Sequence, residues 1–282
     1  MSEMIVQKWN DEISSQALDF LYQHKETSLF LLDNFRRCGA DLGKELYSGN
    51  FKVISEDNKI CAVFCLTQAG NLLLQSDGAQ DYSELVYKSC LEENGPTAGA
   101  IGDWQDAILF WHYVQKANPN VSPKNLSKEK LYALELSETS GTKQDGVRFL
   151  KEDDFEVWHR LDQLYRKEIK LPAHGTTDQK RQQFRERTQQ KHWWGFGNTA
   201  VGCFNACVEG VAQVGGMYTD HNHRKKGQAK KVLETMLWDA YHQHDIHTLI
   251  LFTGQDNIPA QSLYEGAGFR HIGYFGLLFW AF

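Results

Sequence analysis

Residues 211–237, VAQVGGMYTDHNHRKKGQAKKVLETML, decide the fold of this chain. They predict an apolar strand, a short polar turn and a helix whose first turn carries Arg224, Lys225, Lys226, Gly227, Gln228, Ala229, Lys230 and Lys231. A helix N-terminus already carries about half a positive charge, so each cation there costs roughly 0.3–1 kcal/mol unless an anion binds. The five cations of this turn therefore predict a phosphate-binding site, and the alternative is a solvated basic patch.

The backbone of the same turn suits an anion. The first N–H groups of a helix have no acceptor within the helix and point toward a ligand at its end. Gly227 has no Cβ, so the chain can bring its amides close to a pyrophosphate. Beyond the turn, apolar residues recur at helical spacing and predict the face that packs on the core: Ala229, Val232, Leu233, Met236, Leu237, Ala240 and Tyr241.

Two motifs carry a resemblance to a known family. The order Arg224-x-x-Gly227-x-Ala229 after a strand resembles the Arg/Gln-x-x-Gly-x-Gly/Ala signature of the Gcn5-related N-acetyltransferase (GNAT) family. A second stretch resembles that family's downstream motif: Asn257-x-x-Ala260-x-x-Leu263-Tyr264-x-x-x-Gly268-Phe269. The resemblance implies an α/β (α+β) GNAT fold, with a mixed, mostly antiparallel sheet flanked by helices, and acetyl-CoA as co-substrate.

The resemblance also implies a set of coenzyme-binding residues. In the family the amides of the turn hold the pyrophosphate, and the preceding strand splays from its parallel neighbour and binds pantetheine. Gly215 and Gly216 weaken strand 211–218 and predict a bulge there, or else room for a bulky neighbour such as Trp193 or Trp194. The implied residues are Met217, Tyr218, Thr219, Arg224, Lys225, Lys226, Gly227, Gln228, Ala229, Lys230, Asn257, Ala260 and Tyr264.

Asn257 and Tyr264 have two interpretations each. Asn257 precedes a proline in the first helical turn, so it is a helix cap, a ligand of the pantetheine amide, or both. Tyr264 is the candidate general acid, because a pKa of about 10 keeps it protonated while a thiol of pKa about 8.5 leaves as thiolate. The alternative is a buried tyrosine beside Leu263 whose hydroxyl donates to a backbone carbonyl.

The general base is not evident. An amine of pKa about 10.4 is protonated at neutral pH, so its proton must be removed before it attacks a thioester. Many family members place a glutamate on the strand before the turn, where this chain has Gln213. Three possibilities stay open: a water held by Gln213, an acceptor amine of lower pKa such as an α-amino group, or another base, for which the nearest candidates are Asp220, His221 and His174.

Composition excludes several classes of protein. The 282 residues, 41% hydrophobic and 12% aromatic, suffice for one large or two ordinary domains. A net charge of −6 and a pI near 6.0 argue against a nucleic-acid binder, which needs a basic surplus. No stretch approaches the ~18 apolar residues of a membrane span, and residues 1–15 do not resemble a signal peptide. We therefore expect a cytoplasmic protein that binds neither nucleic acid nor membrane.

The cysteines predict neither a metal site nor disulfides. They lie mostly in apolar, strand-like surroundings and show no Cys-x-x-Cys or His-rich spacing. We expect reduced, buried thiols and no metal. The six residues are Cys38, Cys61, Cys65, Cys90, Cys203 and Cys207.

The order of predicted elements repeats. The first half is predicted as a helix at 13–35, strands at 51–55, 60–67 and 72–74, a helix at 82–91, a strand at 97–101, a helix at 104–115 and a strand at 131–136. The second half is predicted as a strand at 147–150, helices at 155–168 and 178–190, strands at 200–208 and 211–218, a helix at 227–241, a strand at 248–253, a helix at 259–267 and a strand at 273–281. This predicts two tandem α/β copies joined near 138–146.

The two copies differ at the turn. Where the second has its basic turn, the first has Gln75-Ser76-Asp77-Gly78-Ala79-Gln80, without a cation and with a carboxylate that would repel pyrophosphate. We expect residues 1–140 to form a degenerate GNAT-like domain without a coenzyme site, and residues 141–282 to form an acetyltransferase domain that binds acetyl-CoA.

Three functions are considered. The favoured one is an acetyl-CoA-dependent N-acetyltransferase in which a small-molecule, amino-acid or peptide amine attacks the thioester directly. The second is a non-catalytic acyl-CoA-binding regulatory module, which the glutamine at position 213 favours. The third is an aminoacyl transferase, since peptidoglycan-bridge enzymes also pair two such folds, but a more basic surface for tRNA would be expected.

Overall fold

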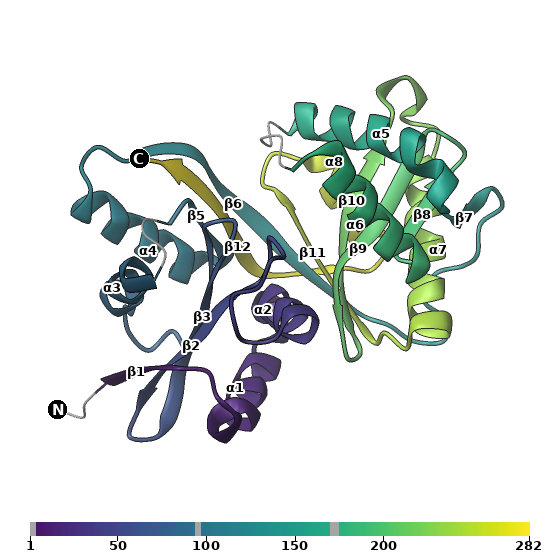
Figure 1. Cartoon of the computed structure of the whole chain (residues 1–282). Coiled ribbons are helices and arrows are strands. Elements are labelled where there is room, and N and C mark those ends of the chain that lie inside the picture. The colour runs from purple at the N-terminus through teal and green to yellow at the C-terminus, as the bar shows by residue number, and fades with distance from the viewer. Residues whose placement is uncertain (1–3, 94–96, 170–174) are drawn as a thin grey trace. The chain divides into compact units, whose positions relative to one another are not determined.

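One order of elements occurs twice in the computed structural model, which describes residues 4–93, 97–169 and 175–282 (Figure 1). Both copies run strand, two helices, three strands, helix, strand, helix, strand. The first contains β1 (Met4–Lys8), α1 (Asp11–Gln23), α2 (Lys25–Cys38), β2 (Gly49–Glu56), β3 (Lys59–Thr67), β4 (Asn71–Ser76), α3 (Ser83–Glu93), β5 (Gly99–Asp103), α4 (Trp104–Ala117) and β6 (Ser122–Glu135).

The second copy repeats that order with two additions. The 3₁₀ turn η1 precedes its first helix, and the 3₁₀ turn η2 precedes its third. It contains β7 (Val147–Phe149), η1 (Glu152–Asp154), α5 (Phe155–Glu168), α6 (Thr177–Gln189), β8 (Trp193–Phe196), β9 (Ala200–Val208), β10 (Val211–Thr219), η2 (His221–His223), α7 (Gln228–His244), β11 (Thr248–Gly254), α8 (Ile258–Gly266) and β12 (Arg270–Ala281). The predicted tandem arrangement is confirmed.

The chain forms two compact units, each with a mixed sheet. Unit 1 contains Met1–Tyr132, Phe252–Asn257 and His271–Phe282, and unit 2 contains Ala133–Leu251 and Ile258–Arg270. In unit 1 the strand order is β1-β2-β3-β4-β5-β12-β6, and in unit 2 it is β11-β10-β9-β8-β7. Parallel pairing joins β4 to β5 and β10 to β11. Antiparallel pairing, as expected for a mostly antiparallel sheet, joins β1 to β2, β2 to β3, β3 to β4, β5 to β12, β7 to β8, β8 to β9 and β9 to β10.

The last strand of the second copy completes the sheet of unit 1. β12 pairs with β5 from Phe275↔Asp103 to Phe279↔Gly99. A Cβ on Gly99 would lie only 2.6 Å from Leu278 O, so glycine permits this close pairing. The compact units therefore do not follow a single boundary at residue 140. Strand pairing between distant segments decides this, and residue composition along the chain carries no signal for it.

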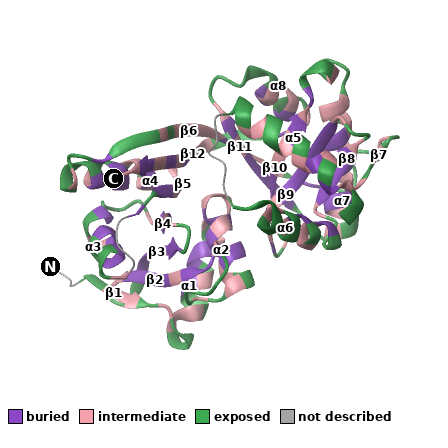
Figure 2. Cartoon of the chain, turned by 45° about the horizontal axis from the view of Figure 1, so that its top comes forward, coloured by how far each residue is buried: buried purple, intermediate pink, exposed green. Residues whose placement is uncertain are grey.

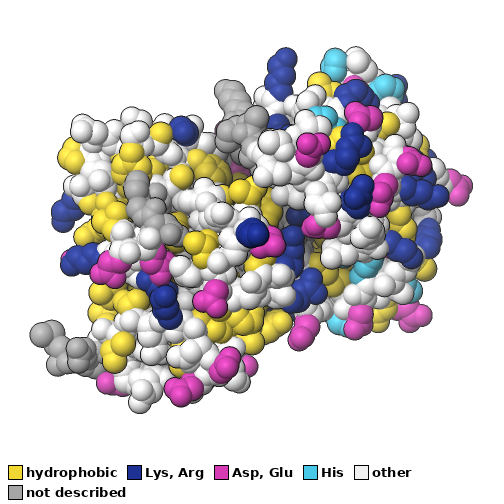
Figure 3. All heavy atoms as spheres, viewed as in Figure 1, with side chains coloured by type: hydrophobic (Ala, Val, Ile, Leu, Met, Phe, Trp, Pro, Cys, Tyr) yellow, Lys and Arg dark blue, Asp and Glu magenta, His cyan; other side chains and the backbone are white. Residues whose placement is uncertain are grey.

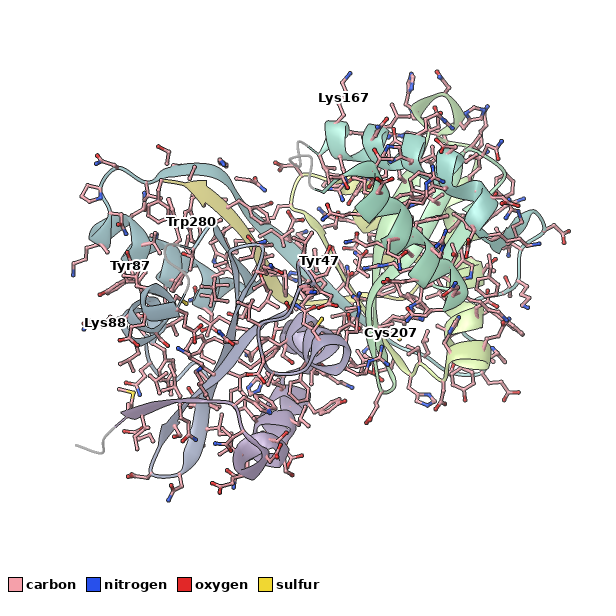
Figure 4. The ribbon with its side chains drawn as sticks, in the orientation of Figure 1. Tyr47, Tyr87, Lys88, Lys167, Cys207 and Trp280 are labelled. Atoms are coloured by element: carbon pink, nitrogen blue, oxygen red, sulfur yellow. The ribbon has the colours of Figure 1, made fainter. Side chains whose placement is uncertain are left out.

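Each unit has an aromatic core between its sheet and helices, and the central strands β3 and β9 are largely buried (Figure 2). In unit 1 the ring of Trp280 lies 5.0 Å from that of Trp111, in the cluster that also contains Tyr87 (Figure 4). In unit 2 the ring of Trp158 lies 4.8 Å from Phe184 and 5.4 Å from Trp193. These cores fix the sheets to which the candidate site residues belong.

The structure corrects some predicted elements. The single helix expected at 13–35 is two helices, because His24, with φ −117° and ψ 32°, leaves the helical conformation and ends α1. Its ring Nδ1 lies 2.9 Å from Phe20 O. Strands β1 and β8 were not anticipated. The burial expected of the cysteines is confirmed for Cys61, Cys65, Cys90 and Cys203, whereas Cys38 and Cys207 are only partly buried.

The predicted connector at 138–146 lies along α7. Thr142 N–H donates to Glu234 O at 3.1 Å, which anchors the connector on the helix backbone. Gly141 has φ +68°, and a Cβ there would overlap Glu234 O. The connector thus depends on glycine at this position for both its conformation and its contact with α7.

We predict that Gly141→Ala lowers the free energy of unfolding of unit 2 by about 3 kcal/mol or more. An alanine held in the left-handed conformation costs ~1–2 kcal/mol, and its Cβ would also clash with the backbone of α7. Gly197→Ala is the matched control, since Gly197 has φ +50° and no atom within 4 Å of its Cβ position. It should lose only about 1–2 kcal/mol. Urea unfolding of both variants measures the difference. Equal losses would contradict the contact with Glu234.

Candidate functional site

β10 separates from its parallel neighbour partway along its length. It pairs with β11 only from Val211↔Thr248 to Gln213↔Ile250. Its antiparallel pairing with β9 continues as far as Thr219↔Ala200. Beyond Gln213, in the part of the chain that the structure describes, the β11 side of β10 has no strand partner. Backbone groups on that edge are available to a ligand.

The two glycines of β10 explain the separation. The ladder with β9 is irregular between Gln213 and Val214 and again between Gly215 and Tyr218. Gly216 has φ +57°, and a Cβ there would lie 3.1 Å from the ring of Trp193. A Cβ on Gly215 would overlap the side-chain amide of Asn205. Both interpretations from sequence therefore hold together: the glycines allow a bulge, and Gly216 makes room for Trp193.

The turn after β10 differs from the expectation in one respect. α7 begins at Gln228, so the prediction that one helical turn carries all five cations is wrong. Gly227 has φ +72° and forms the N-cap, and a right-handed helix cannot begin before such a left-handed residue. Lys225 also has a positive φ, +58°. Of the five cations, Lys230 and Lys231 belong to the first turn, and the other three precede it.

Three lysines at this end of α7 carry uncompensated charge. Lys225, Lys226 and Lys230 are exposed. Among the described residues no carboxylate forms an ion pair with any of the three. Lys231 is different, because its ammonium lies 5.3 Å from the centre of the Phe196 ring. Three free ammonium groups therefore surround the N-terminus of the helix.

Arg224, in contrast, already has an anionic partner. Its guanidinium donates to both carboxylate oxygens of Glu168, at 2.9 and 2.5 Å. Its Nε donates to Thr219 O at 3.0 Å. The side chain of Arg224 thus ties the turn to α5 and to the end of β10. Its family position predicts a coenzyme contact, but in this structure the guanidinium positions the turn.

The backbone of the turn suits a bound diphosphate. Gly227 provides no side-chain cap, and Lys231 N–H is bonded to Gly227 O at 3.0 Å. The amides of Gln228, Ala229 and Lys230 come before the first intrahelical bond and so lack a helical acceptor. The Gln228 side-chain oxygen accepts a 3.0 Å hydrogen bond from the Thr199 hydroxyl, so this oxygen does not cap the amides at the helix end. With the free lysines, these amides fit the pyrophosphate that the family resemblance implies.

The side chains at the end of β10 are committed to the interior of unit 2. Met217 packs against Gly202 on the α7 side. Tyr218 is buried, and its ring lies 6.0 Å from that of Tyr165 on α5. Burial raises the pKa of Tyr218 above its usual range, with the charge of Glu168 acting in the same direction. At Met217 and Thr219, a ligand would therefore meet backbone groups.

The downstream motif surrounds the start of α8. Asn257 is exposed and belongs to unit 1, and its Nδ2 donates to Thr253 Oγ1 at 3.2 Å. Ala260 and Tyr264 belong to α8 in unit 2. Tyr264 is buried and lies edge-on to Phe269, with ring centroids 5.9 Å apart. The motif thus contributes one exposed amide and one buried phenol.

The phenol of Tyr264 is strongly biased toward its protonated form. Burial raises its pKa well above the usual value, and the neighbouring Tyr165 adds to the rise. A neutral phenol can donate a proton, so the environment agrees with the predicted acid. The same environment also suits a tyrosine with a purely structural role. The rate of acetyl transfer by a Tyr264 variant distinguishes the two roles.

Gln213 is buried where the two parallel strands separate. Its Nε2 donates to Val214 O at 2.7 Å, while its Oε1 is buried without a partner among the described residues. An amide cannot remove a proton at neutral pH. The free oxygen can accept a hydrogen bond from a water or an amine.

The other candidate bases among the described residues, Asp220 and His221, are not better placed than Gln213 to accept a proton. Asp220 accepts a 2.9 Å bond from Arg160, and this bond holds its pKa below the usual range. It also caps η2 through Asn222 N–H. His221 is exposed and lies 3.8 Å from the same carboxylate. His174 lies outside the described residues.

Two residues that hold the turn were missed by the sequence analysis. Glu168, at the end of α5, binds Arg224, and Arg160, also on α5, binds Asp220. Each pair joins residues more than fifty positions apart, which only the folded chain brings together. No pattern in the sequence could have identified them.

The corresponding turn of the first copy is satisfied by its own side chains. Asp77 Oδ1 accepts from Ala79 N–H at 3.0 Å, and Asp81 Oδ1 accepts from Ser83 N–H at 2.9 Å at the start of α3. Below the turn, Asp106 accepts from both the N–H and the hydroxyl of Ser76, at 2.7 and 2.5 Å. Carboxylates thus occupy amides that are open at α7.

On the face of unit 2 that Figure 3 shows, Lys and Arg side chains are interspersed with carboxylates. On α5 and α6 they form ion pairs such as Arg181–Glu156 at 2.8 Å. Within the described ranges, no group of His, Cys, Asp and Glu could hold a metal ion, and no helix is long and apolar enough to cross a membrane.

Comparison with known proteins gives one family model and many similar solved structures. Residues 153–269 match the model of the acetyltransferase (GNAT) family. A solved Drosophila protein is similar over 98% of this chain and 99% of its own, with 14% identity and a TM-score of 0.65. A GCN5-related N-acetyltransferase from Sphaerobacter thermophilus is similar over 99% and 95%, with 11% identity and a TM-score of 0.60.

A third similar structure is a tandem GNAT protein from the clavulanic acid biosynthesis pathway. It covers 99% of this chain and 98% of its own, with 12% identity and a TM-score of 0.57. At such low identities these likenesses report the fold alone. No curated protein matches the sequence.

The first-copy turn gives a testable titration. Burial raises the pKa of Asp106 to about 6, while the bonds from Ser76 oppose the rise. Because the folded pKa lies above the unfolded value of about 3.9, its contribution to stability is fully present below about pH 4 and is lost as pH rises through about 6. Carbon-13 NMR of the carboxyl group should show this pKa. Ser76→Ala should raise it further, and a pKa at or below the unfolded value would contradict the burial.

Proposed function

We propose that the chain, whose residues 153–269 match the model of the acetyltransferase (GNAT) family, is an acetyl-CoA-dependent N-acetyltransferase acting on a primary amine. The acceptor is a small molecule, an amino acid or a peptide. One observation carries the proposal: the open N-terminus of α7, with three unpaired lysines, follows directly on a strand whose edge is unpaired.

The turn and α7 bind the pyrophosphate of the coenzyme. The amides of Gln228, Ala229 and Lys230 donate to its oxygens, and each charge-assisted bond adds about 1.5–3 kcal/mol. Lys225 and Lys226 supply positive charge from the exposed part of the turn. Arg224 keeps the turn in place through Glu168.

β10 and α8 bind the pantetheine arm. The backbone groups of Met217 and Thr219, on the unpaired edge of β10, donate to and accept from its amides. The side chain of Asn257 and the start of α8 at Ala260 meet the same arm. Because these groups are held by the core, the thioester is positioned without rearrangement of the sheet.

When bound, acetyl-CoA supplies an acetyl group activated as a thioester. The amine attacks it directly, and unpaired N–H groups of β10 stabilise the developing negative charge on the carbonyl oxygen. Tyr264 donates a proton to the leaving thiolate. Gln213 Oε1 accepts a hydrogen bond from a water or from the amine, but it removes no proton.

We propose that the coenzyme binds to the second copy, residues 141–282. In the first copy, residues 1–140, carboxylates already satisfy the turn, and a diphosphate would meet like charge there. That copy is proposed to be a degenerate GNAT-like domain without a coenzyme site. Calorimetry with the whole chain should therefore give one molecule of CoA per chain.

The lysines provide a test of the coenzyme site. Lys225→Met with Lys226→Met should weaken CoA binding about tenfold at low ionic strength and less at high salt, because exposed charges are screened. Lys231→Met is the control, since its ammonium faces Phe196. Isothermal calorimetry measures both. Equal affinities for the double variant and the control would place the diphosphate elsewhere.

Tyr264 provides a test of catalysis. Tyr264→Phe should lower kcat about a hundredfold or more, because the thiolate loses its proton donor, while the Kd for CoA stays within about twofold. The measurement is thiol release from acetyl-CoA with a panel of amines. Tyr241→Phe, on the distant part of α7, should keep full activity. A chain that binds CoA and turns over no amine would instead be an acyl-CoA-binding regulatory module.

A further inference from the structure

Gln213 carries a buried hydrogen-bond acceptor that the protein itself does not satisfy. The residue is only 2% exposed. Its Nε2 donates to Val214 O at 2.7 Å, which fixes the orientation of the side-chain amide. Its Oε1 then has no partner among the described residues. A buried acceptor without a donor is unfavourable, so Oε1 needs a donor from a ligand.

A glutamine of the first copy shows how the chain can satisfy the same arrangement by itself. Gln75 is buried on β4, the strand before the first-copy turn. Its Nε2 donates to the carbonyl of the next residue, Ser76, at 2.8 Å, as that of Gln213 does. Its Oε1, however, accepts from the hydroxyl of Thr27 on α2 at 2.5 Å. In the second copy no described side chain takes the place of this donor.

The free oxygen lies beside the backbone to which we assign the coenzyme. Gln213 is the last residue of β10 that pairs with β11, and the unpaired edge begins directly after it. The side chains of Gln213 and Asn205 both lie next to Gly215, in the irregular part of the ladder with β9. All of these residues belong to unit 2. An acceptor that reaches the edge of β10 therefore meets Oε1.

The charged and titratable groups on β9 do not favour a cation at this position. Arg187 on α6 donates to the backbone carbonyls of Phe204 and Asn205, at 2.8 and 3.0 Å, so a permanent guanidinium lies on the strand next to β10. Cys203 stays neutral, because burial raises the pKa of its thiol to about 12. An ammonium at Gln213 would lose its hydration and meet like charge.

The carboxylates of α5 are engaged with cations. This helix packs on β10 through Tyr165 and Tyr218. Each of its three carboxylates pairs with an arginine: Glu156 with Arg181, Asp162 with Arg166, and Glu168 with Arg224. In the turn, the bond from Arg160 lowers the pKa of Asp220. Protonating any of these groups would leave an arginine without its counter-charge, so each is a poor base.

We propose that the acceptor is a weakly basic amine, such as the α-amino group of a peptide or of an amino-acid amide, and that Gln213 selects its neutral form. This rests on the function proposed above. Gln213 Oε1 accepts one N–H of the neutral amine, and the nitrogen lone pair stays free to attack the thioester. An α-amino group has a pKa of about 8 and an alkylamine about 10.4, so their neutral fractions at pH 7 differ by about two orders of magnitude.

The reaction balances without a further base. The lone pair of the neutral nitrogen forms the bond to the acetyl carbon, and the carbon–sulfur bond breaks with its electron pair on sulfur. The thiolate takes the proton of Tyr264. The nitrogen then carries one surplus proton, which returns to the phenolate as the amide forms. The products are an N-acetyl amine and CoA thiol, and Gln213 exchanges no proton.

The decisive variant is Gln213→Glu, tested with alaninamide and isopropylamine, which are similar in size but have pKa values of about 8 and about 10. In the wild type at pH 7, kcat/KM should be at least about thirtyfold higher for alaninamide. Gln213→Glu should reduce this preference at least about tenfold, because a carboxylate can hold an ammonium and remove its proton. Gln75→Glu, a buried glutamine with the same local bond, is the control and should keep the wild-type preference.

Binding provides a readout that does not depend on turnover. With CoA bound, calorimetry at pH 7 should show alaninamide binding at least about tenfold tighter than isopropylamine, because only the neutral form binds. If Gln213→Glu does not fold, Gln213→Met keeps the size of the side chain without the oxygen. It should weaken alaninamide binding about tenfold and keep the Kd for CoA within about twofold.

The outcomes separate the two proposals. Equal rates for the two amines in an active wild type, or an unchanged preference in folded Gln213→Glu, overturn the selection by Gln213 and leave the acetyltransferase proposal intact. Unchanged alaninamide affinity in Gln213→Met overturns that selection too. A wild type that binds no CoA, or that binds CoA and acetylates no amine, overturns both proposals.

Discussion

The positive end of α7 is the constraint on which the site depends. Three other helices have a side-chain acceptor at the N-cap: Asn10 at α1, Asp103 at α4 and Thr176 at α6. α7 has a left-handed glycine there and three exposed lysines around it. In the absence of an anion, this concentrates uncompensated positive charge at one point of unit 2. A diphosphate offers that charge a partner together with acceptors for the open amides.

The rest of unit 2 keeps this end in a fixed position. The buried side of α7, including Val232, Leu233 and Met236, packs on the sheet. α5 contributes two ion pairs, through Arg160 and Glu168, which hold the turn from the other side. β10 pairs with its parallel neighbour β11 along only part of its length, because its glycines form bulges beside Trp193. The regular pairing of β10 is thus interrupted beside the turn that leads into α7.

The two copies show how one topology supports different chemistry. Both have a strand, a turn and a helix at corresponding positions. In the first copy, Asp77 and Asp81 occupy the turn amides. In the second, the corresponding amides remain open and cations replace the carboxylates. The difference lies in a few side chains of the turn, since the strand order around it is retained, and fold alone therefore does not identify the functional copy.

The sequence by itself determined the class of fold, the tandem order and the residues of the basic turn. Each depends on local patterns: apolar spacing, a glycine that needs a positive φ, and motifs of a few residues. Its placement of Arg224, Lys225 and Lys226 in the first turn of that helix was wrong, because only the backbone shows that Gly227 is left-handed and must precede α7.

Tertiary structure decided what depends on pairing between distant segments. It assigned β12 to the sheet of unit 1 and paired Arg224 with Glu168 and Asp220 with Arg160. These contacts arise from strand pairing and side-chain packing across many residues, which no local pattern records.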